Sequence, residues 1–389
     1  MRVLVAPDKF KGSMSAGEVA DRLAEGLTGA GVDAVPVPLA DGGEGSVDAA
    51  LRAGYSVEMC PVIGAAGQRH RAKIAVRGHA AVVESANTCG LPTLPAGMLA
   101  PMTASSYGLG EAILHAARRG ARTIVVALGG SASTDGGIGM LAALGYRFHD
   151  AHGETLLPSS YHLHRVQHVV TDRAVSLGHV ELLIASDVTN PLTGPSGTAA
   201  VFARQKGATL TEIDHLEDGL ANLVTAASRS GWPAAPALAA AAGAGAAGGC
   251  GFAAMLLGGT VVSGAEYFLE LLDFDTHLHG ADLVVTGEGQ LDTQTLSGKL
   301  PAVVAQRASP IPVIAVVGRN TLTSGADIFA EVFSVADFCD EKAAHNRGLT
   351  AQILGHIGAH IGQQMIASGA ARNAADIGQR AASARHISS

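Results

Sequence analysis

Short aliphatic runs alternate with helical patterns near both ends of the chain. Residues 3–6 form an aliphatic run typical of a buried strand, and Ser15 and Glu18 form a capping box ahead of apolar residues at helical spacing. Further strands are predicted at residues 35–39, 283–285, 313–317 and 332–335, with helices near residues 47–51 and 300–306. Alternation of this kind predicts a parallel sheet with helices on both faces.

The middle of the chain has a different pattern. Residues 57–63, 73–76 and 81–84 follow one another with no helix between them, which predicts antiparallel pairing. Later elements are a helix at residues 107–117, strands at residues 124–128 and 182–185, and helices that begin at capping boxes of Thr209 and Ser263. We therefore expect an α/β fold, in which a doubly wound domain of residues 1–57 plus 280–389 carries an inserted mixed α/β domain, residues 58–279.

Composition narrows the class of protein. The 389 residues carry a formal net charge of −8 and contain no basic block, which argues against a nucleic-acid partner. Four scattered cysteines form no CxxC pair and are typical of a reducing compartment. The N-terminus runs directly into the first strand, and no apolar stretch makes a convincing membrane span. We expect a cytoplasmic protein without a membrane partner.

Glycine is the strongest departure in composition, because the chain has 50 where the usual share of about 7% predicts roughly 27. Many of the glycines gather in five loops, at residues 41–45, 129–139, 194–207, 243–251 and 287–298. Such clusters mark backbone that takes positive φ or approaches a ligand closely. Three of the five loops carry Asp or Glu, which favours a functional site over simple turns.

The loop at residues 129–139, called here the glycine loop, lies between an aliphatic strand and a helical segment. Loops in this position present several backbone N–H groups to an anion, and hydroxyl side chains add donors. The predicted phosphate-binding residues are Gly129, Gly130, Ser131, Ser133, Thr134, Gly136 and Gly137. Asp135 is expected either to cap the following helix or to bind Mg²⁺. The loop is not a Walker A motif, because no lysine follows its glycines.

Charged and amide side chains follow four of the predicted strands. In a doubly wound sheet the carboxyl ends of the strands are where ligands bind. The candidates are Asp8, Lys9 and Lys11; Asp41 and Glu44; Asp187 and Asn190, with Arg204 and Lys206 downstream; and Glu288, Asp292 and Lys299. The carboxylates suit a metal or a general base, and the cations suit a phosphate or a carboxylate. Solvated turns are the plainer interpretation of each set.

A literal GxGxxG occurs at residues 243–248. In a dinucleotide-binding fold this fingerprint follows a strand, but here an alanine run that contains Pro236 precedes it. We therefore expect tight packing of the chain rather than nicotinamide binding. Lys299 after Gly298 also fails as a Walker A motif, because Thr293 stands where that motif needs glycine.

Six ordered blocks together resemble the type I glycerate kinase family of bacteria. They read APDKFKGSMSAGEVA at 6–20, PLADGGEG at 38–45, ALGGSASTDGGIGMLAALG at 127–145, SDVTNPLTGPSG at 186–197 with FARQKGA at 202–208, GAGAAGGCGFA at 243–253, and TGEGQLDTQTLSGKLP at 286–301. The chain departs from the family in two places. Gln290 stands where members usually carry arginine, and the match is thin beyond Gly318.

The resemblance implies ATP-dependent phosphorylation of D-glycerate, most often to 2-phosphoglycerate, with Mg²⁺. It also implies a flavodoxin-like domain plus a second α/β domain, with the active site in the cleft between them. Catalytic roles then fall to Asp187, Asp292, Lys9 and Lys299, and either aspartate is a candidate general base. The expected substrate-binding residues are Asp8, Lys11, Asp41, Glu44, Asn190, Arg204 and Lys206. ATP is expected to bind the glycine loop and Glu288, and Mg²⁺ is expected to bind Asp135 and Asp187.

Other functions stay open on the sequence. A glycerate 3-kinase, or a kinase of another small hydroxyacid, would share most of these residues. An NAD-dependent hydroxyacid dehydrogenase needs a strand before residue 243, and a non-catalytic sugar-acid sensor does not need three carboxylate-bearing glycine loops. The chain does not decide between a monomer and a homodimer, or between the two positions of phosphorylation.

Overall fold

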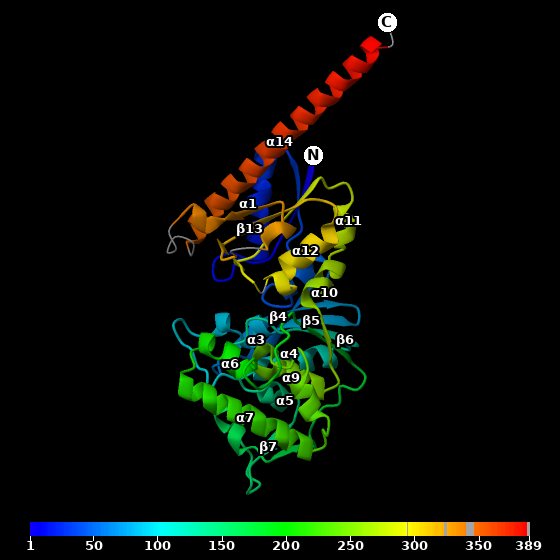
Figure 1. The fold of residues 1–389 in the computed structure, drawn as a ribbon. Coiled ribbons are helices and arrows are strands. Elements are labelled where there is room, and N and C mark those ends of the chain that lie inside the picture. Colours follow the sequence, from blue (N-terminus) through cyan, green and yellow to red (C-terminus); the bar gives the residue numbers. More distant parts are fainter. Residues whose placement is uncertain (294, 323–324, 340–345, 387–389) are drawn as a thin grey trace. The chain divides into compact units, whose positions relative to one another are not determined.

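Residues 1–293, 295–322, 325–339 and 346–386 are described by the computed structural model (Figure 1). Two units divide the chain: unit 1 contains Met1–Leu39 and Asp273–Ser389, and unit 2 contains Ala40–Leu272. Unit 1 is therefore discontinuous in sequence. Among the described helices, none combines the length and apolarity needed to cross a bilayer.

Unit 1 is built on a parallel sheet with the strand order β15-β13-β11-β1-β2. Its strands are β1 (Arg2–Pro7), β2 (Asp33–Pro36), β11 (Leu283–Gly287), β13 (Val313–Val317) and β15 (Glu331–Ser334). Ranked along the chain, they follow the flavodoxin-like order 2-1-3-4-5, in which the winding reverses between the first strand and the third. The doubly wound, flavodoxin-like fold expected from the sequence is confirmed.

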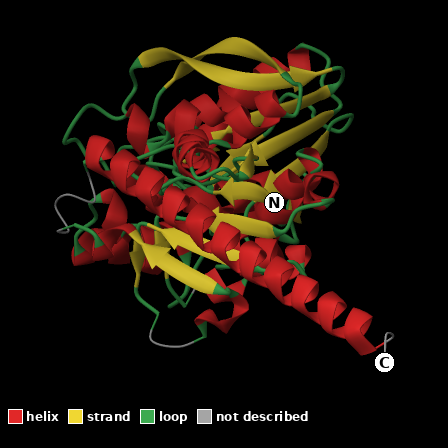
Figure 2. Cartoon of the chain, turned by 90° about the horizontal axis from the view of Figure 1, so that it is seen from above, coloured by secondary structure: helices red, strands yellow, loops and turns green. Residues whose placement is uncertain are grey.

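The helices of unit 1 are α1 (Ala16–Gly29), α11 (Phe274–Leu278), α12 (Leu300–Ala308) and α14 (Arg347–His386). The predicted capping box opens α1, because the Ser15 hydroxyl accepts the N–H of Glu18 and the Glu18 carboxylate accepts the N–H of Ser15. Helix α14 packs along α1 (Figure 1) and is the long helix that ends at the C label in Figure 2. Its buried Leu354 and Ile361 join the core formed by α1 and the sheet.

Strand β2 ends earlier than the predicted residues 35–39. The N–H groups of Val37 and Leu39 still donate to carbonyls of β1 at 2.8 and 2.9 Å. Pro36 and Pro38 alternate with them and have no N–H to donate to a ladder. The aliphatic pattern therefore predicted the pairing correctly, and the prolines lie where no donor to β1 is needed.

Unit 2 is built on a mixed sheet with the strand order β10-β9-β6-β5-β4-β3. These strands are β3 (Ser56–Ile63), β4 (Arg69–Arg77), β5 (Ala80–Glu84), β6 (Thr123–Ala127), β9 (Glu181–Ala185) and β10 (Thr260–Val262). The four strands from β10 to β5 are parallel. Strand β4 pairs antiparallel with β3 and with β5, as the sequence predicted. A small antiparallel pair is formed by β7 (Arg147–His149) and β8 (His168–Val170).

Helices surround this second sheet. They are α2 (Ser46–Arg52), α3 (Ser85–Cys89), α4 (Tyr107–Arg118), α5 (Ile138–Ala143), α6 (Thr198–Phe202), α7 (Leu210–Arg229), α8 (Ala235–Ala240), α9 (Ala246–Leu256) and α10 (Gly264–Leu271). The predicted capping box of Thr209 and Glu212 opens α7, and Ser263 caps α10 by accepting the N–H of Glu266. Leu109 and Ile113 of α4 are fully buried in the core of this unit.

Candidate active site

The carboxyl ends of β1 and β11 meet where the winding of the unit 1 sheet reverses. Pro7 pairs with Gly287, and the residues that follow them are Asp8 and Glu288. The N–H of Asp8 donates to the Gly287 carbonyl at 2.8 Å. Both acidic residues are nearly buried, with 7% and 9% of their surface exposed. Two predicted carboxylates therefore lie on neighbouring strands at the position where doubly wound sheets bind ligands.

Lysines accompany the carboxylates of this edge. Lys9 Nζ lies 3.2 Å from Asp8 Oδ2, and Lys299 Nζ lies 3.5 Å from Asp292 Oδ1. Lys299 immediately precedes α12, and Lys11 is exposed in the turn after β1. Unit 1 thus brings together the two predicted sets that follow β1 and β11.

Thr295 connects two acidic residues of this edge and was not among the predicted site residues. Its hydroxyl donates to Glu288 Oε1 at 2.5 Å, and its N–H donates to Asp292 Oδ1 at 3.2 Å. The residue is fully buried. Its only sequence signal was its place between Asp292 and Lys299, and hydroxyl residues are common in such loops.

A short pair of strands extends the same edge. Strands β12 (Gln290–Leu291) and β14 (Arg319–Asn320) run parallel, with Gln290 opposite Arg319. The N–H of Gly318 donates to the Glu288 carbonyl at 3.0 Å and joins the two segments. Arg319 was also not predicted as a site residue, although it follows β13 much as Asp8 follows β1.

In unit 2 the carboxyl end of β6 lies against the loop at residues 41–45. The N–H of Gly129, just after β6, donates to the Gly42 carbonyl at 3.1 Å. A Cβ at Gly129 would lie 2.4 Å from Gly43 Cα, so only glycine permits this approach. The predicted loop at residues 41–45 and the glycine loop are therefore brought together.

The glycine loop packs on the segment at residues 243–251. The N–H of Gly136 donates to the Gly248 carbonyl at 2.9 Å. A Cβ at Gly248, whose φ is +69°, would lie 2.0 Å from the Ser133 carbonyl oxygen. Helix α8 precedes this segment where a dinucleotide fingerprint requires a strand. The GxGxxG therefore serves close backbone packing, as the sequence indicated.

Asp135 is fully buried within the glycine loop. Its carboxylate accepts hydrogen bonds of 2.8–3.2 Å from the N–H groups of Ser106, Gly137 and Gly139 and from the Ser106 hydroxyl. Burial raises the pKa of this carboxyl, and the hydrogen bonds oppose the rise. Two of these donors lie at the start of α5, so Asp135 helps to order that helix end, although Gly137 occupies the N-cap position. Metal binding by Asp135 stays a prediction.

Lys206 is buried against the glycine loop, with 3% of its surface exposed. Its Nζ donates to Ser131 Oγ at 2.9 Å and to the Ser133 carbonyl at 2.5 Å. Within the described residues, the buried hydroxyls of Ser133 and Thr134 have no hydrogen-bond partner. Arg204, from the same short 3₁₀ helix, is exposed. The two predicted cations therefore have different environments.

Asp187 follows β9 and is partly buried. Its carboxylate accepts the Ser263 hydroxyl at 2.9 Å and the N–H groups of Gly264 and Ala265, at the start of α10, at 2.9 and 3.2 Å. Burial, together with the negative charge of Asp41, raises the pKa of Asp187 to about 6. Asp187 and Asp41 are thus close enough for their charges to interact.

The other predicted residues of unit 2 lie on the same loops. Asp41 accepts a backbone N–H of its own loop at 3.0 Å, and Glu44 is exposed. The side-chain amide of Asn190 donates to the Ser196 carbonyl at 2.8 Å. Glu84, which was not predicted, ends β5 and accepts a backbone N–H from the first turn of α2 at 3.0 Å. These contacts order the loops at the strand ends.

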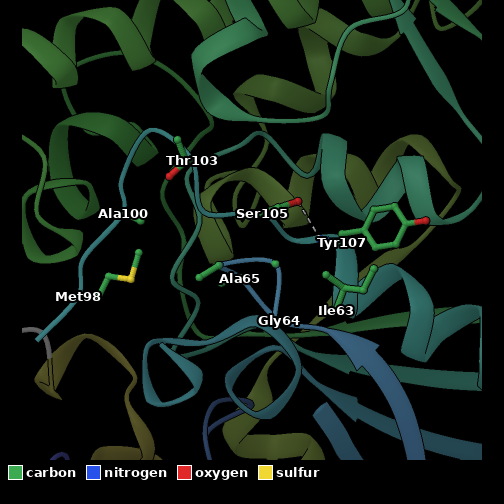
Figure 3. Close-up of a pocket in the computed structure, with 10 residues that line it drawn as sticks. Ile63, Gly64, Ala65, Met98, Ala100, Thr103, Ser105 and Tyr107 are labelled. Carbon is green, nitrogen blue, oxygen red and sulfur yellow. Dashed lines mark hydrogen bonds between the residues drawn. The ribbon is translucent and has the colours of Figure 1, made fainter. Parts of the chain in front are cut away.

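A pocket of about 380 Å³ lies in unit 2 beside the start of α4 (Figure 3). Its lining comes from the end of β3, the turn after it and the segment before α4: Ile63, Gly64, Ala65, Ala66, Gly67, Met98, Ala100, Thr103, Ser105 and Tyr107. The N–H of Ser105 donates to the Ala65 carbonyl at 3.0 Å. The next residue, Ser106, is the hydrogen-bond partner of Asp135, so this pocket adjoins the network that anchors the glycine loop.

The chain is similar to proteins of one family. The model of the glycerate kinase family matches residues 3–358. The glycerate kinase of Bacillus subtilis (strain 168) is 37% identical over 336 residues, which cover 84% of this chain and 87% of that protein. The glycerate 2-kinase of Escherichia coli (strain K12) is 37% identical over 333 residues, which cover 82% of this chain and 86% of that protein.

A solved structure agrees in fold as well as in sequence. It comes from Salmonella typhimurium LT2, is assigned as a glycerate kinase 2, and is 34% identical with a TM-score of 0.75. The match covers 95% of this chain and 99% of that one. The resemblance carried by the six sequence blocks is confirmed, and with it the kinase class. The chain belongs to the glycerate kinase family.

Proposed function

We propose that this kinase transfers the γ-phosphoryl group of ATP to the 2-hydroxyl of D-glycerate. The observation that carries the proposal is the edge of unit 1, where Asp8 and Glu288 lie on neighbouring strands with Lys9 beside them. A glycerate ion needs a cation for its carboxylate and acceptors for its hydroxyls, and this edge supplies both. The 2-position is supported by the sequence resemblance and by the relative from Escherichia coli, a glycerate 2-kinase.

In this proposal the phosphates of ATP bind at the glycine loop. Lys206 gives this loop a buried positive charge, which suits a phosphate group. The hydroxyls of Ser133 and Thr134, which have no partner in the described protein, are further donors. Phosphoryl transfer needs mainly positioning and charge stabilisation, which are what such groups provide.

Asp187 is the proposed general base for the substrate hydroxyl. A base is most effective when its pKa lies near the working pH, and the pKa of Asp187 is raised to about 6. Asp292 is the second candidate. Its carboxylate lies 3.5 Å from Lys299, so accepting a proton would break an ion pair.

Mg²⁺ is expected to accompany ATP, and the residues fit it in part. In the described chain no three His, Cys, Asp or Glu side chains gather as ligands. Mg²⁺ in kinases usually takes one or two carboxylates and completes its shell with phosphate and water. Asp187 would hold it, because it is less buried than Asp135, whose fully buried carboxylate is held by four donors. When bound, Mg²⁺ would neutralise charge on the phosphates.

The test is ADP release by the purified protein with D-glycerate and with analogues that lack one group. Glycerol lacks the carboxylate, lactate lacks the 3-hydroxyl, and 3-hydroxypropionate lacks the 2-hydroxyl. We expect D-glycerate to be the best substrate and phosphorus NMR to identify 2-phosphoglycerate. A 3-phosphoglycerate product would refute the 2-position. Turnover of another hydroxyacid with no turnover of D-glycerate would refute D-glycerate as the substrate. Inactivity on all of these compounds would refute the kinase function.

A further inference from the structure

Arg319 stands at the carboxyl edge of unit 1, two residues after the end of β13. Its N–H donates to the Gly289 carbonyl at 3.1 Å, and the N–H of Thr321 donates to the Leu291 carbonyl at 2.9 Å. These hydrogen bonds hold β14 against β12, which follows Glu288 in the chain. The backbone of Arg319 is therefore fixed beside the acidic edge.

The register of this pair sets the direction of the Arg319 side chain. Arg319 is the pairing partner of Gln290. Partners in a parallel pair put their side chains on the same face, on strands about 4.8 Å apart. Arg319 is partly buried and Gln290 is exposed. One face of the pair thus presents a guanidinium beside an amide, next to the loop that carries Glu288 and Asp292.

The chemistry of Arg319 differs from that of the lysines of this edge. Lys9 and Lys299 are point charges. Arginine offers a planar fork of donors that matches a carboxylate with two parallel hydrogen bonds. We propose that Arg319 binds the carboxylate of the hydroxyacid substrate, with the Gln290 amide donating beside it. This inference rests on the kinase function proposed above.

The pairing also accounts for a departure in the sequence. Gln290 stands at the position where the resemblance leads us to expect arginine, and Arg319 lies directly across the strand pair from it. A guanidinium at either position serves the same face. In this chain the guanidinium of the pair is supplied by β14.

The test compares KM for D-glycerate and KM for ATP in Arg319→Gln, Arg319→Lys and the double variant Gln290→Arg/Arg319→Gln. Loss of the charged pair in Arg319→Gln should raise KM for D-glycerate by about 10- to 100-fold, with KM for ATP changing less than about threefold. Lysine should recover only part of the affinity, because it lacks the fork. The double variant should recover most of it, because it returns a guanidinium to the same face.

Two controls make the result specific. Arg22→Gln removes an exposed arginine of α1 that pairs with Glu25, and it should change neither KM. Any slow turnover of glycerol, which has no carboxylate, should be insensitive to Arg319→Gln. If Arg319→Gln does not fold, as judged by thermal unfolding, Arg319→Lys and the double variant decide the question by the same KM ratio.

The outcomes separate this inference from the proposed function. Inactive wild-type protein overturns both. Active wild-type protein with an unchanged KM for D-glycerate in the variants overturns the role of Arg319 alone. A rise confined to KM for ATP also overturns it, since the guanidinium would then bind phosphate.

Discussion

The two units equip the ends of their parallel strands in different ways. In unit 1, Asp8 and Glu288 follow paired strands, and a charged side chain, Lys9, lies beside them. In unit 2, the corresponding edge is made largely of glycine, and Gly129 approaches Gly43 so closely that a Cβ at Gly129 would lie 2.4 Å from Gly43 Cα. One edge therefore carries charged side chains, and the other is built from backbone segments in close contact.

This difference predicts how each edge responds to substitution. Removing a charged side chain from unit 1 takes away a contact but leaves the ladder between β1 and β11 intact. Adding one methyl group to the glycine loop or its support forces backbone against backbone, which a close-packed interior does not absorb. We expect substitutions of the first kind to change kinetics more than stability, and those of the second kind to do the reverse. Asp187 is a charged group on the glycine-rich edge and should behave like a unit 1 residue.

The largest expected effect is that of Asp187→Asn on kcat. Loss of a general base should lower kcat by about 10²–10⁴-fold. Asparagine keeps an oxygen that accepts the N–H groups of α10, so the variant should fold. Asp292→Asn is the matched variant in unit 1 and should lower kcat much less. Steady-state kinetics measures both, and full kcat in the two variants together would contradict a base at either position.

Magnesium dependence separates the two roles proposed for Asp187. A metal ligand that loses its charge weakens Mg²⁺ binding, so excess Mg²⁺ should restore much of the activity. A missing base is not restored in this way. We expect the kcat of Asp187→Asn to stay low at saturating Mg²⁺. Recovery would instead assign Asp187 to the metal and leave Asp292 as the base.

Gly248→Ala tests the backbone packing of unit 2. The new Cβ would lie 2.0 Å from the Ser133 carbonyl oxygen, in a residue with φ of +69°. Gly153→Ala is the matched control, because Gly153 has φ of +79° but nothing within 4 Å of the added atom. The control should lose about 1–2 kcal/mol of unfolding free energy and Gly248→Ala roughly 3 kcal/mol or more, measured by denaturant unfolding. Equal losses of unfolding free energy would mean that the loop shifts to accommodate the methyl group.

The sequence predicted well those features whose cause is local. The capping box at Ser15 and the antiparallel pairing of β3, β4 and β5 depend on residues close together in the chain, and both are present. Lys206 shows the limit of this reasoning. Lys206 lies two residues after the exposed Arg204 and resembled a second surface cation. It is in fact buried, and its Nζ donates to Ser131 and Ser133, which lie more than 70 residues away in the chain.

Arg319 and Thr295 show the same limit on the unit 1 edge. Neither has a motif of its own, and each gains its place only from a partner that the fold supplies. Arg319 depends on the pairing of β14 with β12, two strands of two residues each. Thr295 depends on the orientation of Glu288. Elements so short give no periodicity from which a strand or a contact could be predicted.

Lys206→Met should cost less stability than Gly248→Ala but more than a surface change. The substitution leaves the Ser133 carbonyl and the Ser131 hydroxyl without the Lys206 donor, and a buried acceptor left unpaired costs about 1–3 kcal/mol. Arg204→Gln, from the same short helix, should stay within about 0.5 kcal/mol of wild type. Denaturant unfolding compares the pair. A larger loss for Arg204→Gln would contradict the assignment of the buried role to Lys206.

Asp41→Asn should produce the smallest change, a shift in the pH dependence of kcat. A general base works only when ionised, so kcat should fall as the pH is lowered through about 6, the raised pKa of Asp187. Burial is the main cause of the raised pKa, and the charge of Asp41 adds to it. Removing that charge should therefore move the acid limb of the kcat profile to lower pH. An unmoved limb would contradict an interaction between the two carboxylates.

The pH dependence of the unfolding free energy gives a second test of the raised pKa of Asp187. Because the pKa of Asp187 is higher in the folded chain than the usual value of about 3.9, its ionisation costs stability. Its contribution is most favourable below the unfolded pKa, falls as the pH rises, and is fully lost above about 6. The unfolding free energy of wild type minus that of Asp187→Asn should thus decrease across this range. An increase would mean that the hydrogen bonds from Ser263 and α10 stabilise the ionised form of Asp187 more than burial destabilises it.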